Sequence, residues 1–209
     1  MQKRKAYRNK FFYEAIREGL SNGAAFICLQ EADDFYIEFN YWKVLSYGPL
    51  KIIVNWSTTK RAEILNGAQV TYKGGKTYFM QVGILMNDGT TLNIVHVHLH
   101  HQVAKKIGTA AYSEIFTTMG NWIQSATCPV IVAGDFNQTG TRGLIEESFR
   151  KHSDVRLRKL SSDDDPCNIL VVMTDSTSIG KMLHTPADLL QSGSHHPILA
   201  VVRGGQSQT

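Results

Sequence analysis

Hydrophobic and polar positions along the chain predict many strands and few helices. Short apolar runs, bounded by glycine, asparagine, aspartate or proline, recur along the chain and have the length typical of strands. Spacings of three or four residues between apolar positions indicate helices at 8–20, 108–124 and 143–152. The predicted strands lie at 24–30, 42–47, 51–56, 68–72, 78–86, 91–98, 129–133, 155–160, 168–174 and 197–202.

The order of these elements predicts an α+β protein of mostly antiparallel strands. Asn87-Asp88-Gly89, between two predicted strands, is a strong hairpin signal. Several strands are apolar on both faces, and two packed sheets with helices outside would cover both faces. We therefore expect a two-layer β-sandwich flanked by helices. Residues 1–203 would form a single domain, with a disordered tail at 204–209.

Composition adds little beyond a globular protein. The 209 residues fit one domain, and the net charge of +4 is compatible with a polyanionic substrate without requiring one. No apolar run is long enough to span a bilayer, and no secretory signal follows the basic start, so we expect an intracellular protein. The cysteines Cys28, Cys128 and Cys167 form no closely spaced metal pair and are expected to be small buried hydrophobes.

The strongest chemical signal is Gly134-Asp135-Phe136-Asn137, which follows an apolar strand. Residues two apart on extended backbone point to the same face, so Asp135 and Asn137 are predicted to aim at one spot. An acid beside an amide suits a phosphate ester, because the acid can orient or deprotonate water while the amide donates to a phosphoryl oxygen. An ordinary turn at a strand exit would carry the same residue types.

Three other strand ends carry reactive residues. Glu31 follows a buried strand and is a candidate ligand for a hard cation such as Mg²⁺. His96, His98 and His100 share one face if their strand stays extended, and with His101 they could bind zinc instead. His195 and His196 precede the last predicted strand.

These four segments, in this order, resemble the motifs of the endonuclease/exonuclease/phosphatase superfamily, which has the pancreatic-deoxyribonuclease fold. Phe-Ile-Cys-Leu-Gln-Glu at 26–31 looks like its "LQE" motif, and His98-Leu99 looks like the end of "N-x-H-L". Residues 134–137 match "GDFN", and 194–197 look like a changed "S-D-H-x-P". The resemblance covers roughly residues 8–203, and four ordered motifs are more specific than any single one.

The resemblance implies a nuclease that hydrolyses nucleic-acid phosphodiester bonds with Mg²⁺ or Mn²⁺. Glu31 would bind the metal, and Asp135 would orient or deprotonate the attacking water. Asn137 would hold a phosphoryl oxygen. His98 and a histidine of the last motif would contact the phosphate. For that last role we favour His195, and a second alignment gives His196.

The chain also departs from the family pattern. The usual first strand, which ends in a metal-site asparagine, is not found before the predicted helix, which begins near Asn9. Either the sequence is truncated, or the sheet is one strand short, or another segment replaces this strand. His96 replaces the asparagine of "N-x-H-L", and either Ser194 or His195 replaces the aspartate of the last motif. Cys167 stands where the family places an aspartate on the penultimate strand, although Asp163, Asp164 and Asp165 lie just upstream.

Three alternative functions stay open on the sequence alone. The lost carboxylates favour a catalytically impaired binding protein on the same fold. A lipid or inositol phosphate hydrolase would use the same motifs. A zinc hydrolase built on the His96–His101 segment would leave Glu31 and Asp135 without a role.

Overall fold

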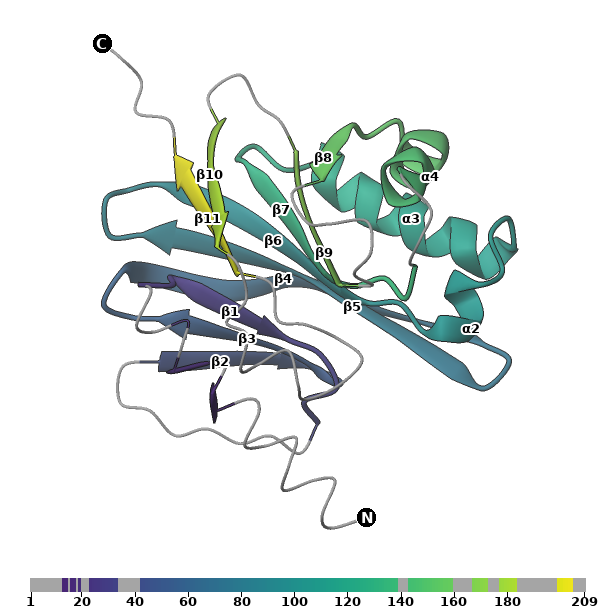
Figure 1. Cartoon of the computed structure of the whole chain (residues 1–209), viewed down its shortest axis with the longest axis horizontal. Coiled ribbons are helices and arrows are strands. Elements are labelled where there is room, and N and C mark those ends of the chain that lie inside the picture. The colour runs from purple at the N-terminus through teal and green to yellow at the C-terminus, as the bar shows by residue number, and fades with distance from the viewer. Residues whose placement is uncertain are drawn as a thin grey trace.

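Two sheets, a further pair of strands and a few helices make up the described part of the protein (Figure 1). The computed structural model describes residues 13–14, 16–17, 19, 23–33, 42–138, 143–159, 167–172, 177–183 and 199–204. Its elements are β1 (Phe26–Leu29), β2 (Trp42–Tyr47), β3 (Leu50–Asn55), β4 (Thr59–Tyr72), β5 (Gly75–Met86), β6 (Thr91–His98), α2 (His101–Ala104), α3 (Ala110–Gln124), β7 (Val130–Asp135), α4 (Leu144–Ser153), β8 (Leu157–Lys159), β9 (Cys167–Val172), β10 (Thr177–Leu183) and β11 (Leu199–Gly204).

The strand order explains how distant segments meet. The smaller sheet has the order β1-β3-β2, the larger β4-β5-β6-β7-β9-β8, and β10 pairs with β11. Among the described pairs only β6 and β7 run parallel. The predicted mixture of α and β structure, with few helices and mostly antiparallel strands, is confirmed. No helix in the described residues is long and apolar enough to cross a membrane.

Some elements were not predicted. β4 begins at Thr59, well before the predicted start at Ala68. The prediction missed the first half of this strand because that half is polar and contains two register shifts. The short helix α2 and the strand β10 were missed altogether. Gly204, assigned to the tail, is the last residue of β11, whereas residues 205–209 lie outside the described part. The single domain stays a prediction.

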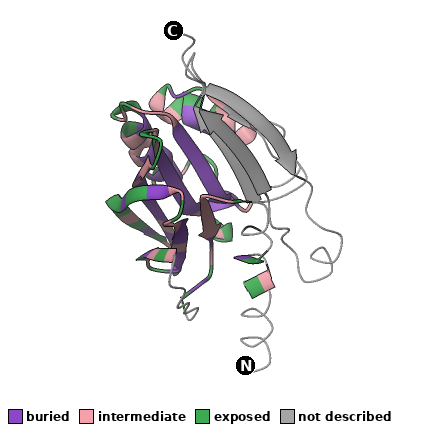
Figure 2. Ribbon diagram, turned by 90° about the vertical axis from the view of Figure 1, so that its left-hand side faces the viewer, coloured by how far each residue is buried: buried purple, intermediate pink, exposed green. Residues whose placement is uncertain are grey.

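Alternating side chains of the two sheets form one apolar layer. Buried residues on β2, β3, β5 and β6 pack together in this layer: Leu45, Leu50, Ile52, Val54, Met80, Val82, Ile84 and Ile94. Cys28 packs against Ile131 and Ala133 of β7, and its burial raises the pKa of the thiol to about 12. Figure 2 shows that buried residues gather along the strands in the middle of the molecule.

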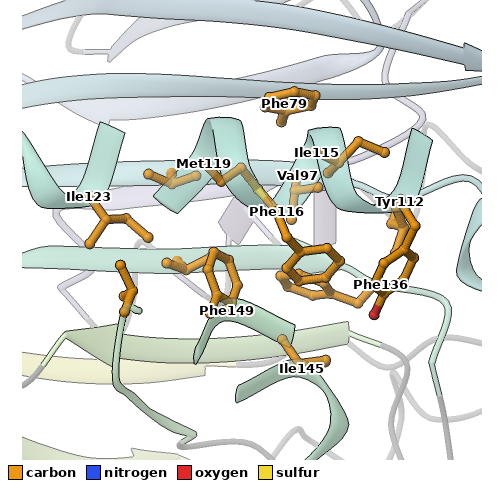
Figure 3. Packing of buried hydrophobic residues seen from close by; sticks show 14 of the residues in the cluster. Phe79, Val97, Tyr112, Ile115, Phe116, Met119, Ile123, Phe136, Ile145 and Phe149 are labelled. Carbon is orange, nitrogen blue, oxygen red and sulfur yellow. The ribbon is translucent and has the colours of Figure 1, made fainter. Parts of the chain in front are cut away.

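The opposite face of the larger sheet is covered by α3 and α4 (Figure 3). Thr109 caps α3 by accepting the backbone N–H of Tyr112 at 3.3 Å, and the apolar residues that follow recur every three or four positions. Phe116 lies between Phe136 and Phe149, with ring centroids 6.3 and 5.0 Å away. Each fully buried side chain of this size contributes about 1.5–3 kcal/mol to stability.

Gly134 sets the contact between the two parallel strands. Its φ is +153°, and a Cβ at this position would overlap the backbone of Val97 on β6. Only glycine tolerates both the positive φ and the close approach of a neighbouring backbone. The residue directly after it is Asp135, so this contact fixes where that carboxylate leaves the sheet.

We expect Gly134→Ala to lower the free energy of unfolding by about 3 kcal/mol or more, because both strands must shift. Gly74→Ala is the matched control. Gly74 also has a positive φ, of +81°, but a Cβ there would meet nothing within 4 Å. That change should cost only about 1 kcal/mol. Urea unfolding measures both, and equal losses would contradict the proposed steric role of Gly134.

Candidate functional site

The carboxyl ends of three strands bring the predicted site residues together. Because β6 and β7 are parallel, both end at the same edge of the larger sheet, and His98 is the register partner of Asp135. Glu31 follows β1, and its Oε1 lies 3.7 Å from Nε2 of His98. Residues far apart in the sequence therefore meet at one place, where Glu31 contacts His98 and His98 is paired with Asp135. Their roles stay predictions.

The chain turns sharply after β7. Asn137 has a φ of +50°, its backbone N–H donates to Oδ1 of Asp135 at 2.7 Å, and its Nδ2 donates to the Leu99 carbonyl at 2.8 Å. The prediction that Asp135 and Asn137 lie on one extended strand is therefore wrong. A carboxylate that accepts the N–H two residues on forms an Asx turn, and this local bond replaces the strand geometry.

Glu31 and His98 differ in exposure. The Glu31 side chain is 65% exposed and that of His98 is 14% exposed. An ion pair at 3.7 Å with one well-exposed partner contributes little to stability, so the Glu31 carboxylate can exchange this contact for another. Glu31 has a φ of +53°, and left-handed residues other than glycine cost free energy and are concentrated at functional sites.

His96 lies beneath this site as a buried imidazole. Its Nε2 is 3.4 Å from Nε2 of Gln30, and no described residue makes a hydrogen bond of ordinary geometry with its Nδ1. Burial, and after it the neighbouring His98, lower the pKa of His96 to about 3, although the nearby Leu29 carbonyl opposes the shift. His96 is therefore neutral at physiological pH.

The predicted common face holds for His96 and His98, which lie two apart on β6, but the strand does not continue to His100. β6 ends at His98, and His100 caps α2 by accepting the backbone N–H of Gln102 at 3.3 Å on its Nδ1. The ring of His100 stacks instead on that of His101, with centroids 4.2 Å apart. Within the ranges that the structure describes, no three His, Cys, Asp or Glu residues form a group able to hold a metal ion.

Gln138, which the sequence did not single out, ties the turn after β7 to the helices. Its Nε2 donates to the Tyr112 hydroxyl at 3.0 Å, and that hydroxyl lies 2.7 Å from Oγ of Ser148. Burial raises the pKa of Tyr112, so the hydroxyl keeps its proton. The only available sequence signal was a polar residue directly after Asn137, and such a residue is ordinary in a loop.

Several predicted positions lie outside the described residues. Those with a predicted role or alignment are Asn9, Asp163, Asp164, Asp165, Ser194, His195 and His196. The question of a missing first strand lies there as well. Cys167 is described as the first residue of β9, and it pairs with Asp135. The position at which the family resemblance implies an aspartate is thus beside the candidate site.

Comparison with known proteins finds a shared fold rather than a sequence match. No protein-family model matches the sequence, and no curated protein matches it either. The catalytic domain of human Nocturnin, solved with a bound sulfate anion, is 17% identical with a TM-score of 0.62, over 94% of this chain and 87% of that one.

Two bacterial structures are similar to the same extent. A mannosyl-6-phosphatase of Bacteroides thetaiotaomicron is 12% identical with a TM-score of 0.65, over 94% of this chain and 91% of that one. An endonuclease/exonuclease/phosphatase family protein of the same species is 13% identical with a TM-score of 0.65, over 93% and 88%. The resemblance predicted from the four motifs is therefore confirmed at the level of the fold.

The buried His96 predicts a pH dependence of stability. The imidazole has an ordinary pKa of 6.5 once the chain unfolds, so below about pH 6.5 the unfolded state binds a proton that the folded state does not. Stability should fall as the pH drops from about 6.5 towards about 3, by up to roughly 1.4 kcal/mol per pH unit.

His96→Asn should remove this contribution, so its stability should fall less steeply over the same range. Urea unfolding of both proteins at several pH values measures the two slopes. The contributions of the other histidines to the slope are present in both proteins, so they cancel in the comparison. Parallel slopes would show that His96 is protonated as readily in the folded protein as in the unfolded chain.

Proposed function

We propose that this chain, which has the endonuclease/exonuclease/phosphatase fold, is a divalent-metal-dependent phosphodiesterase that hydrolyses nucleic-acid phosphodiester bonds. The observation that carries the proposal is the meeting of Glu31, His98 and Asp135 at the ends of β1, β6 and β7. The apolar layer shared by the two sheets supports the finer fold prediction, a two-layer β-sandwich with helices outside.

The donor set suits a hard cation. Mg²⁺ is typically bound by one or two carboxylates, with water and phosphate oxygens completing its shell, so it needs no dedicated group of three side chains. The exposed carboxylate of Glu31 would hold the metal, and Mn²⁺ would accept the same oxygen donors. When bound, such an ion polarises a phosphoryl oxygen and neutralises charge that develops on it.

Asp135, Asn137 and His98, at the ends of β7 and β6, would activate the water and bind the phosphate. The Asn137 N–H holds Oδ1 of Asp135, which orients the carboxylate to receive a proton from an attacking water. The amide of Asn137 has two N–H groups, and the one not given to Leu99 can donate to a phosphoryl oxygen. His98 would donate to the same phosphate once Glu31 binds the cation.

His195 or His196 would supply a further imidazole to the phosphate, and this role stays a prediction. The position at which the resemblance implies its carboxylate partner is Cys167, which pairs with Asp135. A carboxylate in that place would orient the imidazole and raise its basicity. The register of Cys167 therefore favours a second candidate function, namely binding of the same substrate with little hydrolysis.

We expect Asp135→Asn to reduce kcat about hundredfold or more, because a positioned general base typically contributes that much. Asp88→Asn is the matched control. Asp88 is an exposed aspartate on the β5–β6 turn, where its carboxylate accepts the Thr90 N–H at 2.8 Å. Its replacement should leave the rate unchanged.

Metal-dependent hydrolysis should be followed on single-stranded DNA, on RNA, on a phosphoinositide and on mannose 6-phosphate. Cleavage of nucleic acid that needs Mg²⁺ or Mn²⁺ and is lost in Asp135→Asn supports the proposal. Activity that survives this change would contradict the role of Asp135 as the general base. Substrate binding with no hydrolysis by the wild-type protein favours the second candidate, and hydrolysis of the other esters alone excludes a nuclease.

A further inference from the structure

We propose that Tyr78 and Lys76 on β5, with Tyr47 behind them, form a subsite that binds the nucleotide next to the reacting phosphate of a single-stranded nucleic acid. This inference rests on the proposed function, because it assigns the substrate class of the same site. It uses residues that none of the four sequence motifs contains, and it follows from the register of β5 with β6.

Tyr78 adjoins the candidate site directly. It is the register partner of His98 across the β5–β6 ladder, and residues directly opposite each other in such a ladder point to the same face. That face is the one turned towards β1, since His98 meets Glu31 there. A group bound beside His98 therefore has the half-buried Tyr78 as its next neighbour along the sheet.

Neighbouring glycines hold the two tyrosine rings in place. A Cβ on Gly48 would lie 2.7 Å from the ring of Tyr78, and a Cβ on Gly67 would lie 2.6 Å from the ring of Tyr47. The two rings meet edge to face, with centroids 6.4 Å apart. Both side chains are only half-buried, so a packed aromatic pair remains partly open beside His98.

Lys76 adds a positive charge on the same face. It lies two residues before Tyr78 on β5, which is about 7 Å along the strand, and its side chain is exposed. The hairpin segment 66–87 contains Lys73 and Lys76 and no aspartate or glutamate. No carboxylate of this segment therefore offsets the charge that Lys76 presents.

An aromatic side chain beside a lysine matches the chemistry of a single nucleic-acid strand. Unpaired bases stack on aromatic rings, and lysines contact the phosphates between them. In a duplex the base faces are already stacked on one another, so they cannot use Tyr78. A single small phosphate ester bound at His98 and Asp135 has no base to stack on Tyr78 and no second phosphate to reach Lys76.

Binding can be measured separately from hydrolysis. A fluorescein-labelled single-stranded oligothymidylate is titrated with the full chain in EDTA, and its anisotropy is recorded at several salt concentrations. Lys76→Gln should reduce the slope of log Kd against log salt by roughly 0.7, the value for one phosphate contact in a single strand. Lys60→Gln is the matched control, since Lys60 is exposed at the opposite end of the same hairpin.

The aromatic contact is tested at Tyr78. Tyr78→Leu should weaken binding about tenfold, since stacking on one base contributes roughly that much, while Tyr78→Phe should bind like the wild type. Thermal unfolding of each variant shows whether it is folded. Should Tyr78→Leu fail to fold, the exposed Lys76 still decides the matter.

The inference is overturned if Lys76→Gln has the salt slope of the wild type, or if a folded Tyr78→Leu binds normally. It is also overturned if duplex DNA binds as tightly as the single strand and the Lys76→Gln and Tyr78→Leu changes weaken the binding of both equally. Hydrolysis of bis(4-nitrophenyl) phosphate with Mn²⁺ tests the proposed function independently. If the protein hydrolyses this ester but the variants bind the oligonucleotide like the wild type, only the proposed subsite is contradicted. If the variants show the expected binding effects but the protein hydrolyses nothing, only the proposed enzymatic activity is contradicted.

Discussion

The parallel pairing of β6 with β7 is the constraint on which the candidate site depends. All the remaining strand pairs in the described sheets are antiparallel. Only β6 and β7 therefore have their carboxyl ends side by side at one edge. Gly134 allows the close approach, because any side chain there would overlap the backbone of Val97. His98 and Asp135 are neighbours for this reason, and the smaller sheet then delivers Glu31 from the facing layer.

The same segment also belongs to the apolar core. Phe136, between the two polar residues of the turn, is fully buried and packs near Phe116 of α3. Gln138 continues the connection through the hydroxyl of Tyr112. A turn anchored in this way cannot move its carboxylate without disturbing the helices, and such rigid support is what a site for phosphoryl transfer requires.

The sequence predicted well whatever depends on local patterns. The apolar runs gave β2 and β6 with their observed bounds, and four short motifs indicated the fold. The prediction failed where a local hydrogen bond or the sheet register determines the position of a side chain. Asn137 turns because Asp135 accepts its N–H, and His100 leaves the strand to cap α2. The position of Tyr78 beside His98 depends on the register of two strands, which no single strand encodes.

The central claim is that one cation-binding phosphate site lies at the ends of β1, β6 and β7. Paramagnetic broadening of backbone amide signals by Mn²⁺ tests this claim most directly, because it reports position without requiring activity. We predict that the amides of Glu31, Leu99 and Asn137 broaden together at the lowest Mn²⁺ concentrations, well before that of Asp88 at the opposite end of the sheet. Broadening that begins at Asp88, or that leaves Glu31 unaffected, would contradict the claim.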